Sequence, residues 1–355
     1  MTLPRSVETA DVSGKRVLVR ADLNVPLEDG AVADDTRIRA ALPTLRWLLD
    51  HGAAEVSVCS HLGRPETPDD RERYAIAPVA RRLAELLPDT RVRVLENTRF
   101  HLGETTNDVA YAREVAEGMD VYVNDAFGSA HRAHSSTEAV AHLLPAYAGF
   151  LMLEELERLG RLLGDVERPF VLVVGGAKVA DKLGVLQHLG GRADTVIVGG
   201  KMAAELAAQS PLAGVNVELP VDVVAADAFA PDAKTQIVRA DALPDGWLGL
   251  DVGPESCGRF GAIVHEARTV FWNGPLGVFE WPRFAAGTEA MAHAVAEAGR
   301  MGAYTVVGGG DSVRAIQELG LADQISWVST GGGASLELLE GRELPGVAAI
   351  PEAAR

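Results

Sequence analysis

The chain has 355 residues, and 33 lysine and arginine residues against 50 aspartate and glutamate residues give it a formal net charge of −17. A strongly acidic surface repels DNA, RNA and anionic lipids over long range, so general binding to nucleic acids or membrane surfaces is excluded. Hydrophobic residues make up 47% and charged residues 23%, a globular composition that excludes disorder for most of the chain, and the length favours two domains.

The beginning of the chain and its cysteines indicate the compartment. Residues 1–16 contain no apolar signal core, and no apolar run is long enough to cross a membrane. Cys59 and Cys257 lie far apart and match no metal-binding or redox spacing, so we expect reduced thiols. We therefore expect a soluble, cytoplasmic protein.

In the first half of the chain, short apolar strands alternate with amphipathic helices. Helical periodicity covers residues 37–51 and 77–87. Near-continuous Val and Ile runs between helices are typical of a parallel sheet that is covered on both faces. The expected strands lie within residues 16–24, 55–64, 92–100 and 120–128.

The second half repeats this scheme after a helical pattern at 151–165, and its expected strands lie within 170–178, 195–201, 269–277, 304–312 and 325–333. We predict an α/β protein with two doubly wound, parallel-sheet, Rossmann-like domains, separated by a cleft and joined by a hinge helix. The predicted domains are residues 1–150 and 166–342, with 151–165 as the interdomain helix.

All five strands of the second half end in turns that contain glycine. Glycine turns at helix N-termini let backbone N–H groups approach an anion closely, and open α/β sheets bind ligands at this carboxyl edge. The Walker phosphate loop is absent, since Gly200-Lys201 lacks the upstream glycine and Met202 stands at the Ser/Thr position. The dinucleotide fingerprint is also absent, which disfavours a dehydrogenase.

Lysine is scarce in this chain, with only Lys15, Lys178, Lys182, Lys201 and Lys234. Lys178 and Lys182 are four residues apart, and we expect them on one face of the helix that opens after Gly175-Gly176. They are either a pair of ammonium groups aimed at phosphate or part of a solvated helix face. Asp311, after the glycine run 308–310, can hold Mg²⁺ beside a phosphate, cap a helix, or do both.

The strand ends of the first half carry a different chemistry. Taken singly, each arginine there is explained by a surface salt bridge, but the placement of the whole set favours a small, multiply anionic ligand. His131 and His134 have no suitable third ligand nearby, which disfavours a transition-metal site. The candidate residues are Asp22, Asn24, Arg37, His61, Arg64, Arg99, His131, Arg132 and His134. Glycine turns in one domain and an arginine-rich cup in the other suit phosphoryl transfer across a cleft.

Ten motifs in the chain resemble those of one family, the phosphoglycerate kinases. They cover nearly the whole chain in the family's order, and several are long enough to be specific. Among them are RADLNVP (20–26), SHLGRP (60–65), YVNDAFGSAHRAHSST (122–137), GGAKVADK (175–182), WNGPLGVFE (272–280) and GGGDS (308–312).

The resemblance implies reversible phosphoryl transfer between ATP and 3-phosphoglycerate by a monomer, with Mg²⁺ as cofactor and small molecules as partners. It implies that Arg37 and Lys178 are catalytic, that Asp311 holds the metal, and that 3-phosphoglycerate is bound by Asp22, Asn24, His61, Arg64, Arg99 and Arg132. The implied nucleotide site consists of Gly176, Ala177, Lys182, Gly199, Gly200, Gly249, Leu250, Asn273, Pro275, Glu280, Gly309, Gly310, Asp311 and Ser312. The last residues, about 343–355, are expected to return to the N-terminal domain.

Two departures from the family pattern lie near the implied adenosine site. The family usually reads G-G-G-M-A-x-T-F where this chain reads GGKMAAEL (199–206), with Lys201 and Glu205 in place of small or uncharged residues. The stretch between Leu206 and Val215 is also short. These departures leave open an alternative, a paralogue that binds nucleotide weakly and acts as a ligand- or protein-binding module.

Overall fold

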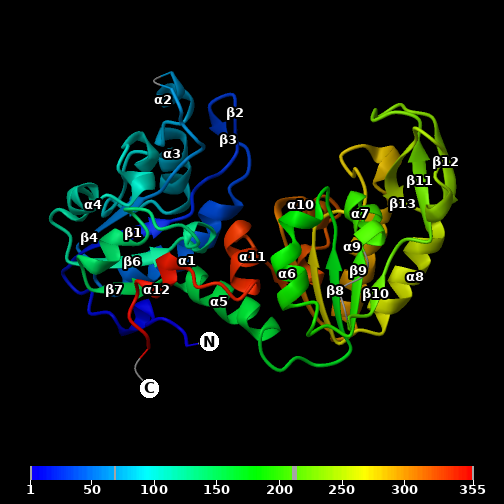
Figure 1. The fold of residues 1–355 in the computed structure, drawn as a ribbon. Helices are drawn as coiled ribbons and strands as arrows, with labels where there is room; N and C mark the ends of the chain where they lie inside the picture. The colour runs from blue at the N-terminus through cyan, green and yellow to red at the C-terminus, as the bar shows by residue number, and fades with distance from the viewer. Residues whose placement is uncertain (1, 68, 210–213, 354–355) are drawn as a thin grey trace. The chain divides into compact units, whose positions relative to one another are not determined.

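The computed structural model describes residues 2–67, 69–209 and 214–353, and the chain divides into two compact units (Figure 1). Unit 1 consists of Met1–Glu157 together with Glu343–Arg355, and unit 2 is Arg158–Arg342. The boundary falls inside helix α5 (Phe150–Leu162).

Unit 1 is built on a sheet of five parallel strands in the order β5-β4-β1-β6-β7. Four of these strands lie inside the segments predicted from the apolar runs, so the expectation of a parallel α/β sheet is confirmed. A separate hairpin pairs β2 (Leu27–Glu28) with β3 (Ala31–Val32). The five strands are β1 (Arg16–Ala21), β4 (Glu55–Cys59), β5 (Val92–Val94), β6 (Val121–Asp125) and β7 (Ala146–Ala148).

The helices of unit 1 form where apolar residues recur at helical spacing. In α1, Ile38, Leu42, Leu45 and Leu49 share one face and are buried against the sheet. Helix α4 begins after Asp108, whose carboxylate accepts a hydrogen bond from the amide of Ala110. Besides α5, the helices are α1 (Thr36–Asp50), α2 (Asp70–Arg73), α3 (Ala77–Leu86), α4 (Val109–Ala116) and α12 (Pro345–Ala348).

A buried aspartate at the end of β6 anchors the start of α5. Oδ1 of Asp125 accepts hydrogen bonds from the amides of Leu151 (2.9 Å) and Met152 (3.3 Å). Asp125 is fully buried, and this burial raises the pKa of its carboxyl group to about 7. An aspartate in an unfolded chain has a pKa of about 3.9. Between about pH 4 and about pH 7, the folded chain therefore holds a proton on Asp125 that the unfolded chain has lost.

We expect this proton to make the stability of unit 1 pH-dependent in a sense opposite to that of a salt-bridged aspartate. The free energy that the protonated Asp125 contributes to folding is fully present below about pH 4 and is lost as the pH rises towards 7. In Asp125→Asn, which cannot ionise, the free energy of unfolding relative to wild type should therefore rise by on the order of 2 kcal/mol between about pH 5 and about pH 8. Urea unfolding of both proteins at each pH measures it, and a difference that does not change with pH would contradict a neutral Asp125.

The end of the chain returns to unit 1. The amide of Arg5 donates to the carbonyl of Pro351 (2.8 Å), and the amide of Gly346 donates to the carbonyl of Ala130 (2.9 Å). The side-chain amide of Asn124, at the end of β6, donates to the carbonyl of Gly346 (3.1 Å). These bonds join residues 344–353 to strand ends near the candidate site, while residues 354–355 lie outside the described residues.

Unit 2 contains a sheet of six parallel strands in the order β10-β9-β8-β14-β15-β16. All five strands that were predicted to end in glycine turns belong to it, which confirms that these turns share one sheet edge. The strands are β8 (Phe170–Val174), β9 (Thr195–Val198), β10 (Val217–Glu218), β14 (Thr269–Asn273), β15 (Tyr304–Gly308) and β16 (Trp327–Val328).

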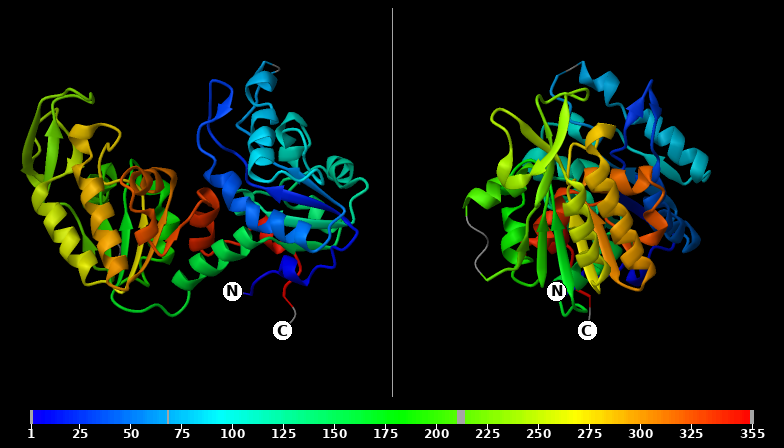
Figure 2. Two further views of the ribbon diagram at one scale, coloured as in Figure 1. Left: turned by 180° about the vertical axis from the view of Figure 1, so that it is seen from behind. Right: turned by 90° about the vertical axis from the view of Figure 1, so that its right-hand side faces the viewer.

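Helices pack on the strands of unit 2, and α8 and α9 lie side by side (Figure 2). Trp272 and Phe260, which lie on β14 and α8, are completely or almost completely buried in the core of the unit. The helices are α6 (Leu183–His188), α7 (Lys201–Gln209), α8 (Pro254–His265), α9 (Ala286–Arg300), α10 (Gly310–Glu318) and α11 (Gly333–Leu339). In the described part of the chain, no helix combines the length and apolar character needed to cross a membrane.

Unit 2 also carries a small antiparallel sheet that the apolar pattern did not predict. It has the order β12-β11-β13, with β11 (Asp222–Ala226), β12 (Thr235–Arg239) and β13 (Leu248–Val252). Strand β12 is largely exposed, so it lacks the continuous apolar run by which buried strands are recognised in a sequence.

Candidate active site

The polar residues predicted to form a cup in unit 1 follow the carboxyl ends of neighbouring strands. Asp22 and Asn24 follow β1, His61 and Arg64 follow β4, and Arg132 follows β6. Since β4, β1 and β6 are adjacent and parallel, their ends lie at one edge of the sheet. The structure therefore brings these residues to one place.

Arg37 joins this edge from the first turn of α1 and forms an ion pair with Asp22. The backbone at Gly128 passes so close that a Cβ there would meet Oδ2 of Asp22, which explains the glycine. Asp22 is 6% exposed, and its other carboxylate oxygen, Oδ1, is buried without a hydrogen-bond partner in the part of the chain that is described. This oxygen can accept a hydrogen bond from a ligand hydroxyl.

Arg99 and Asn24 hold the loop after β4 from two sides. Oδ1 of Asn24 accepts a hydrogen bond from the amide of Gly63 (2.8 Å), and Nη1 of Arg99 donates to the carbonyl of Gly63 (2.6 Å). Arg64, the next residue, is exposed. Nε of Arg99 is buried and has no hydrogen-bond partner among the described residues, so it can donate to a bound anion.

The positive charges around the cup favour the binding of an anion. Burial, assisted by the neighbouring charges of Arg132, Arg20 and Arg64, lowers the pKa of Arg99 to about 10. Burial also lowers the pKa of His61 well below its usual value, and Arg20, Arg99 and Arg37 act in the same direction. A multiply charged anion would relieve this mutual repulsion.

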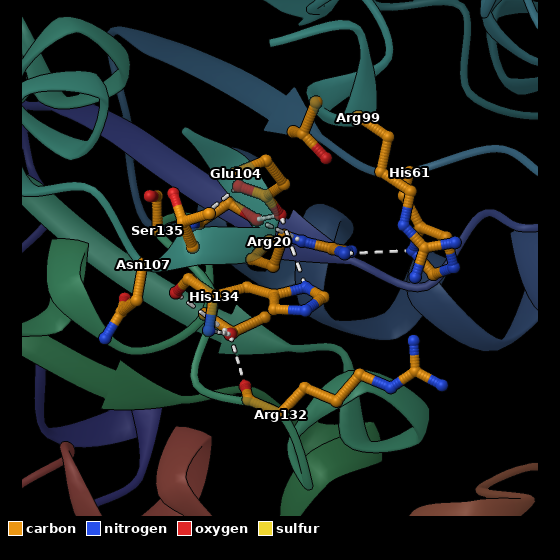
Figure 3. A network of polar contacts seen from close by, with 12 residues as sticks. Arg20, His61, Arg99, Glu104, Asn107, Arg132, His134 and Ser135 are labelled. Carbon is orange, nitrogen blue, oxygen red and sulfur yellow. Dashed lines mark hydrogen bonds and ion pairs between the residues drawn. The ribbon is translucent and has the colours of Figure 1, made fainter. Parts of the chain in front are cut away.

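Two residues behind the cup were not predicted from the sequence. Arg20 on β1 is only 1% exposed, and Glu104 is completely buried (Figure 3). They are linked through Ser136, which accepts a hydrogen bond from Nε of Arg20 (2.8 Å) and donates one to Glu104 (2.6 Å). The RADLNVP motif includes Arg20, but an arginine in a strand gives no sign by itself that it is buried.

In unit 2 the glycine turns pack directly on one another. A Cβ on Gly200, where φ is +65°, would lie 2.7 Å from the carbonyl oxygen of Gly176, and a Cβ on Gly274 would collide with Gly175. The amide of Gly175 donates to the carbonyl of Asn273 (3.0 Å), and the amide of Gly200 donates to that of Leu276 (3.0 Å). Only glycine permits this approach, which brings the turns after β8, β9 and β14 together.

Lys178 and Lys182 do not lie on one helix face, so that prediction is wrong. Lys178 has an extended backbone and precedes a 3₁₀ turn, η6 (Val179–Asp181), and α6 begins only after Lys182. The amide of Val179 donates to the carboxylate of Glu205 (3.2 Å). Because the 3₁₀ turn separates Lys178 from the start of α6, the two lysines do not share a helix face.

Lys182 points into the glycine turns, whereas Lys178 is exposed. Nζ of Lys182 donates to Oδ1 of Asn273, and burial lowers the pKa of Lys182 against the opposing effect of Asp181, Asp311 and Glu340. Nδ2 of Asn273 is buried and has no hydrogen-bond partner within the described chain. Lys182, Asn273 and the exposed carboxylate of Asp311 therefore form one polar cluster.

Helix α10 begins beside this cluster. Gly309, its N-cap, has φ of +87°, and Ser312 accepts a hydrogen bond from the amide of Gly274 (2.6 Å). Gly310 and Asp311 occupy the first turn, where free amides favour a negatively charged group. The structure thus brings the GGGDS turn next to Asn273.

The remaining predicted nucleotide residues lie around the same sheet edge. Gly249 and Leu250 belong to β13, and the carbonyl of Leu250 accepts a hydrogen bond from the amide of Val278 (2.8 Å). Glu280 lies 3.8 Å from the guanidinium of Arg314 on α10, a partner that was not predicted. Ala177, Gly199 and Pro275 lie in the turns after β8, β9 and β14.

A divalent metal fits this cluster only together with a phosphate ligand. No group of three or more metal-ligating side chains occurs in the described ranges. Mg²⁺, however, is commonly held by one or two carboxylates, several waters and the phosphates of a substrate. Asp311 supplies one exposed carboxylate beside Lys182. The donor set therefore suits Mg²⁺ carried by a nucleotide.

Comparisons with known proteins agree along the whole chain. The family model described as "Phosphoglycerate kinase" matches residues 7–94, 87–213 and 203–342. The phosphoglycerate kinase of Chloroflexus aurantiacus is 50% identical over 398 residues that cover 98% of this chain and 99% of that protein. The phosphoglycerate kinase of Rubrobacter xylanophilus is 50% identical over 390 residues, covering 98% of each.

Solved structures give the same result. The phosphoglycerate kinase of Coxiella burnetii superposes with a TM-score of 0.86 at 38% identity, and that of Pyrococcus horikoshii with 0.83 at 30%. Each comparison covers 98% of both chains.

The alignment with the Chloroflexus relative is longer than this chain, so the relative carries positions that are missing here. The three family matches overlap at residues 87–94 and 203–213. The second overlap includes part of the stretch between Leu206 and Val215 that was expected to be short. Residues 210–213 in this stretch lie outside the described residues.

Proposed function

The chain belongs to the phosphoglycerate kinase family, and from this premise we propose that it transfers the terminal phosphoryl group of ATP to 3-phosphoglycerate and catalyses the reverse reaction. The observation that best supports this reading is the arginine-rich cup of unit 1 in a chain whose net charge is −17. A cationic site of this kind in an acidic protein suits a small anion. The proposal includes a monomeric, cytoplasmic enzyme whose partners are small molecules.

We propose that 3-phosphoglycerate binds in the cup of unit 1. Within the described chain, Oδ1 of Asp22 and Nε of Arg99 have no hydrogen-bond partner. Oδ1 of Asp22 would accept a hydrogen bond from the substrate hydroxyl, and Nε of Arg99 would donate one to the substrate phosphate or carboxylate. The exposed Arg64 can pair with the same anion. The full set of proposed ligands is Asp22, Asn24, His61, Arg64, Arg99 and Arg132.

The nucleotide is proposed to bind at the glycine turns of unit 2. Lys182, Nδ2 of Asn273, which has no hydrogen-bond partner among the residues described, and the first turn of α10 supply donors for the phosphates. Glu280 would accept hydrogen bonds from the ribose. The adenosine would contact the glycine turns and strand β13, through Gly176, Ala177, Gly199, Gly200, Gly249, Leu250 and Pro275.

The reaction requires charge neutralisation more than proton transfer. The attacking group of 3-phosphoglycerate is a carboxylate, which is ionised near neutral pH, so no general base is required. Arg37 in unit 1 and Lys178 in unit 2 would offset the negative charge that gathers around the transferring phosphoryl group. Both can act on one phosphoryl group only if the units come together when both substrates are bound, and we propose such a closing step.

Asp311 is the residue proposed to hold Mg²⁺. When bound, the ion would neutralise phosphate charge and orient the nucleotide. Lys182 and Asn273 would hold the phosphates in place beside it.

A coupled assay tests this function. Purified protein with Mg²⁺, ATP and 3-phosphoglycerate should form ADP at a rate that depends on all three, and omission of 3-phosphoglycerate is the control. No ADP above background would overturn the proposal. Running GTP beside ATP measures whether Lys201 and Glu205 alter nucleotide selectivity, and ordinary ATP affinity would eliminate the alternative of a weakly binding paralogue.

A further inference from the structure

Arg20 lies beneath the anion cup with its guanidinium enclosed by protein. Nε of Arg20 donates to the hydroxyl of Ser136 (2.8 Å), and Nη1 donates to the carbonyl of Ala21. Its Nη2 lies 3.0 Å from Nδ1 of His61 (Figure 3). Arg20 is 1% exposed and His61 is 8% exposed, so water competes little for these contacts.

The contact with His61 determines the protonation of the imidazole. A guanidinium has only hydrogen-bond donors, so Nδ1 of His61 must be the acceptor and carry no proton. The ring proton then lies on Nε2, and the ring is neutral. We infer that Arg20 is a positioning residue that holds His61 as the neutral Nε2–H tautomer, so that His61 offers the bound anion one N–H donor and no charge. The part of this inference that concerns the anion rests on the proposed function, whereas the tautomer does not.

Glu104 fixes the other end of this chain of hydrogen bonds. It is completely buried, and its two oxygens accept from the hydroxyl (2.6 Å) and the amide (3.1 Å) of Ser136. The single hydroxyl proton of Ser136 is donated to Glu104, so the hydroxyl oxygen of Ser136 can accept a hydrogen bond from Nε of Arg20. The direction of each hydrogen bond in the chain from Glu104 through Ser136 and Arg20 to His61 is thereby assigned. The buried carboxylate also offsets the buried guanidinium charge through one hydroxyl group.

The charges that face His61 come from four elements of unit 1, and all of them disfavour a charged imidazole. They are Arg20 from β1, Arg99 from the 3₁₀ turn η2 (Thr98–Phe100), Arg37 from α1 and His134 from the segment after β6. Burial lowers the pKa of His134 to about 4, so this ring is itself neutral between about pH 8 and about pH 5.5, although its Nδ1 lies 3.9 Å from Oε1 of Glu104. Adding a proton to His61 would therefore place one more positive charge among arginines, and the ring should remain neutral under mildly acidic conditions.

The tautomer can be measured on the wild-type chain without substrate. Long-range proton–nitrogen NMR of the histidine rings, with His61 assigned by the signal lost in His61→Gln, should show Nε2–H and no titration between about pH 8 and about pH 5.5. An Nδ1–H ring, or titration of His61 within that range, would overturn the inference. Because no ligand is present, failure here leaves the proposed substrate site untouched.

An arginine variant then tests positioning against a merely structural role. In Arg20→Gln, the pKa of His61 should rise towards its ordinary value of about 6.5, because one of the positive charges that oppose protonation of the ring is removed. The KM for 3-phosphoglycerate should rise roughly tenfold at about pH 7.5, and part of that rise should disappear at about pH 5.5 because the protonated imidazole then supplies a charge. The partial recovery should be lost in the double variant Arg20→Gln/His61→Gln.

The matched control is Arg16→Gln, at the exposed start of the same strand, where Arg16 lies 3.8 Å from Asp120. Its KM should follow that of wild type at both pH values. An equal rise in KM at both pH values in Arg20→Gln would overturn the positioning role. Should Arg20→Gln fail to fold, the wild-type NMR measurement still decides the tautomer.

Discussion

Replacing Arg37 by alanine is expected to lower kcat by about 10²–10³-fold while the chain remains folded. Arg37 reaches the anion cup from the first turn of α1, where it pairs with Asp22. A guanidinium acting on the transferring phosphoryl group stabilises charge that is greatest in the transition state, so its loss affects kcat more than KM. Because the variant leaves the carboxylate of Asp22, whose side chain is 7% exposed, without this ion-pair partner, it should lose some stability but still fold. Steady-state kinetics with both substrates, together with thermal unfolding, measures both effects.

The same helix offers a matched control for this prediction. Arg39 is also on α1 and forms an ion pair with Asp35 (2.7 Å), but its side chain is 55% exposed. Arg39→Ala should keep kcat within about twofold of wild type, because exposed ion pairs contribute little. Near-normal kcat in Arg37→Ala would refute the catalytic role. A rise in KM alone would make Arg37 a binding residue only.

Replacing Lys178 by alanine should also lower kcat by about 10²–10³-fold, with no change in the melting temperature. Lys178 is exposed and has an extended backbone, so its truncation removes no packing from the core. Its ammonium group would act on the phosphoryl group from the nucleotide side. The loss should appear with saturating ATP and 3-phosphoglycerate, since the binding groups of both sites remain.

Lys234 provides the control, because it is an exposed lysine between β11 and β12 of the small antiparallel sheet. Lys234→Ala should turn over like wild type. If Lys178→Ala kept its kcat and only the KM for ATP rose, Lys178 would have to be reassigned to nucleotide binding.

The parallel sheets and the position of the candidate site followed from local patterns. Buried parallel strands require continuous apolar runs, and such runs placed β1, β4, β8, β9 and β14 in segments that the structure confirms. Polar residues directly after those strands had to meet at the carboxyl edge of each sheet. The cup and the glycine turns were therefore predictable before any contact was known.

Other features depend on contacts that no local pattern contains. Arg20 lies near the end of an apolar strand, and its burial depends on Ser136 and Glu104, which are distant in sequence. Lys178 and Lys182 have helical spacing, but the backbone between them forms a 3₁₀ turn, whose first amide, that of Val179, donates to Glu205. The exposed strand β12 has no apolar run to reveal it.

The α/β class and the two candidate sets of anion-binding residues thus follow from the order of amino acids alone, because strand burial and glycine turns leave local signatures. Which of those side chains hold one another in place depends on how the chain folds. The pairing of Asp22 with Arg37, the bond from Lys182 to Asn273 and the protonation of His61 all depend on partners from other elements. Hydrogen bonds and desolvation are properties of three-dimensional neighbours, so only the folded chain specifies them.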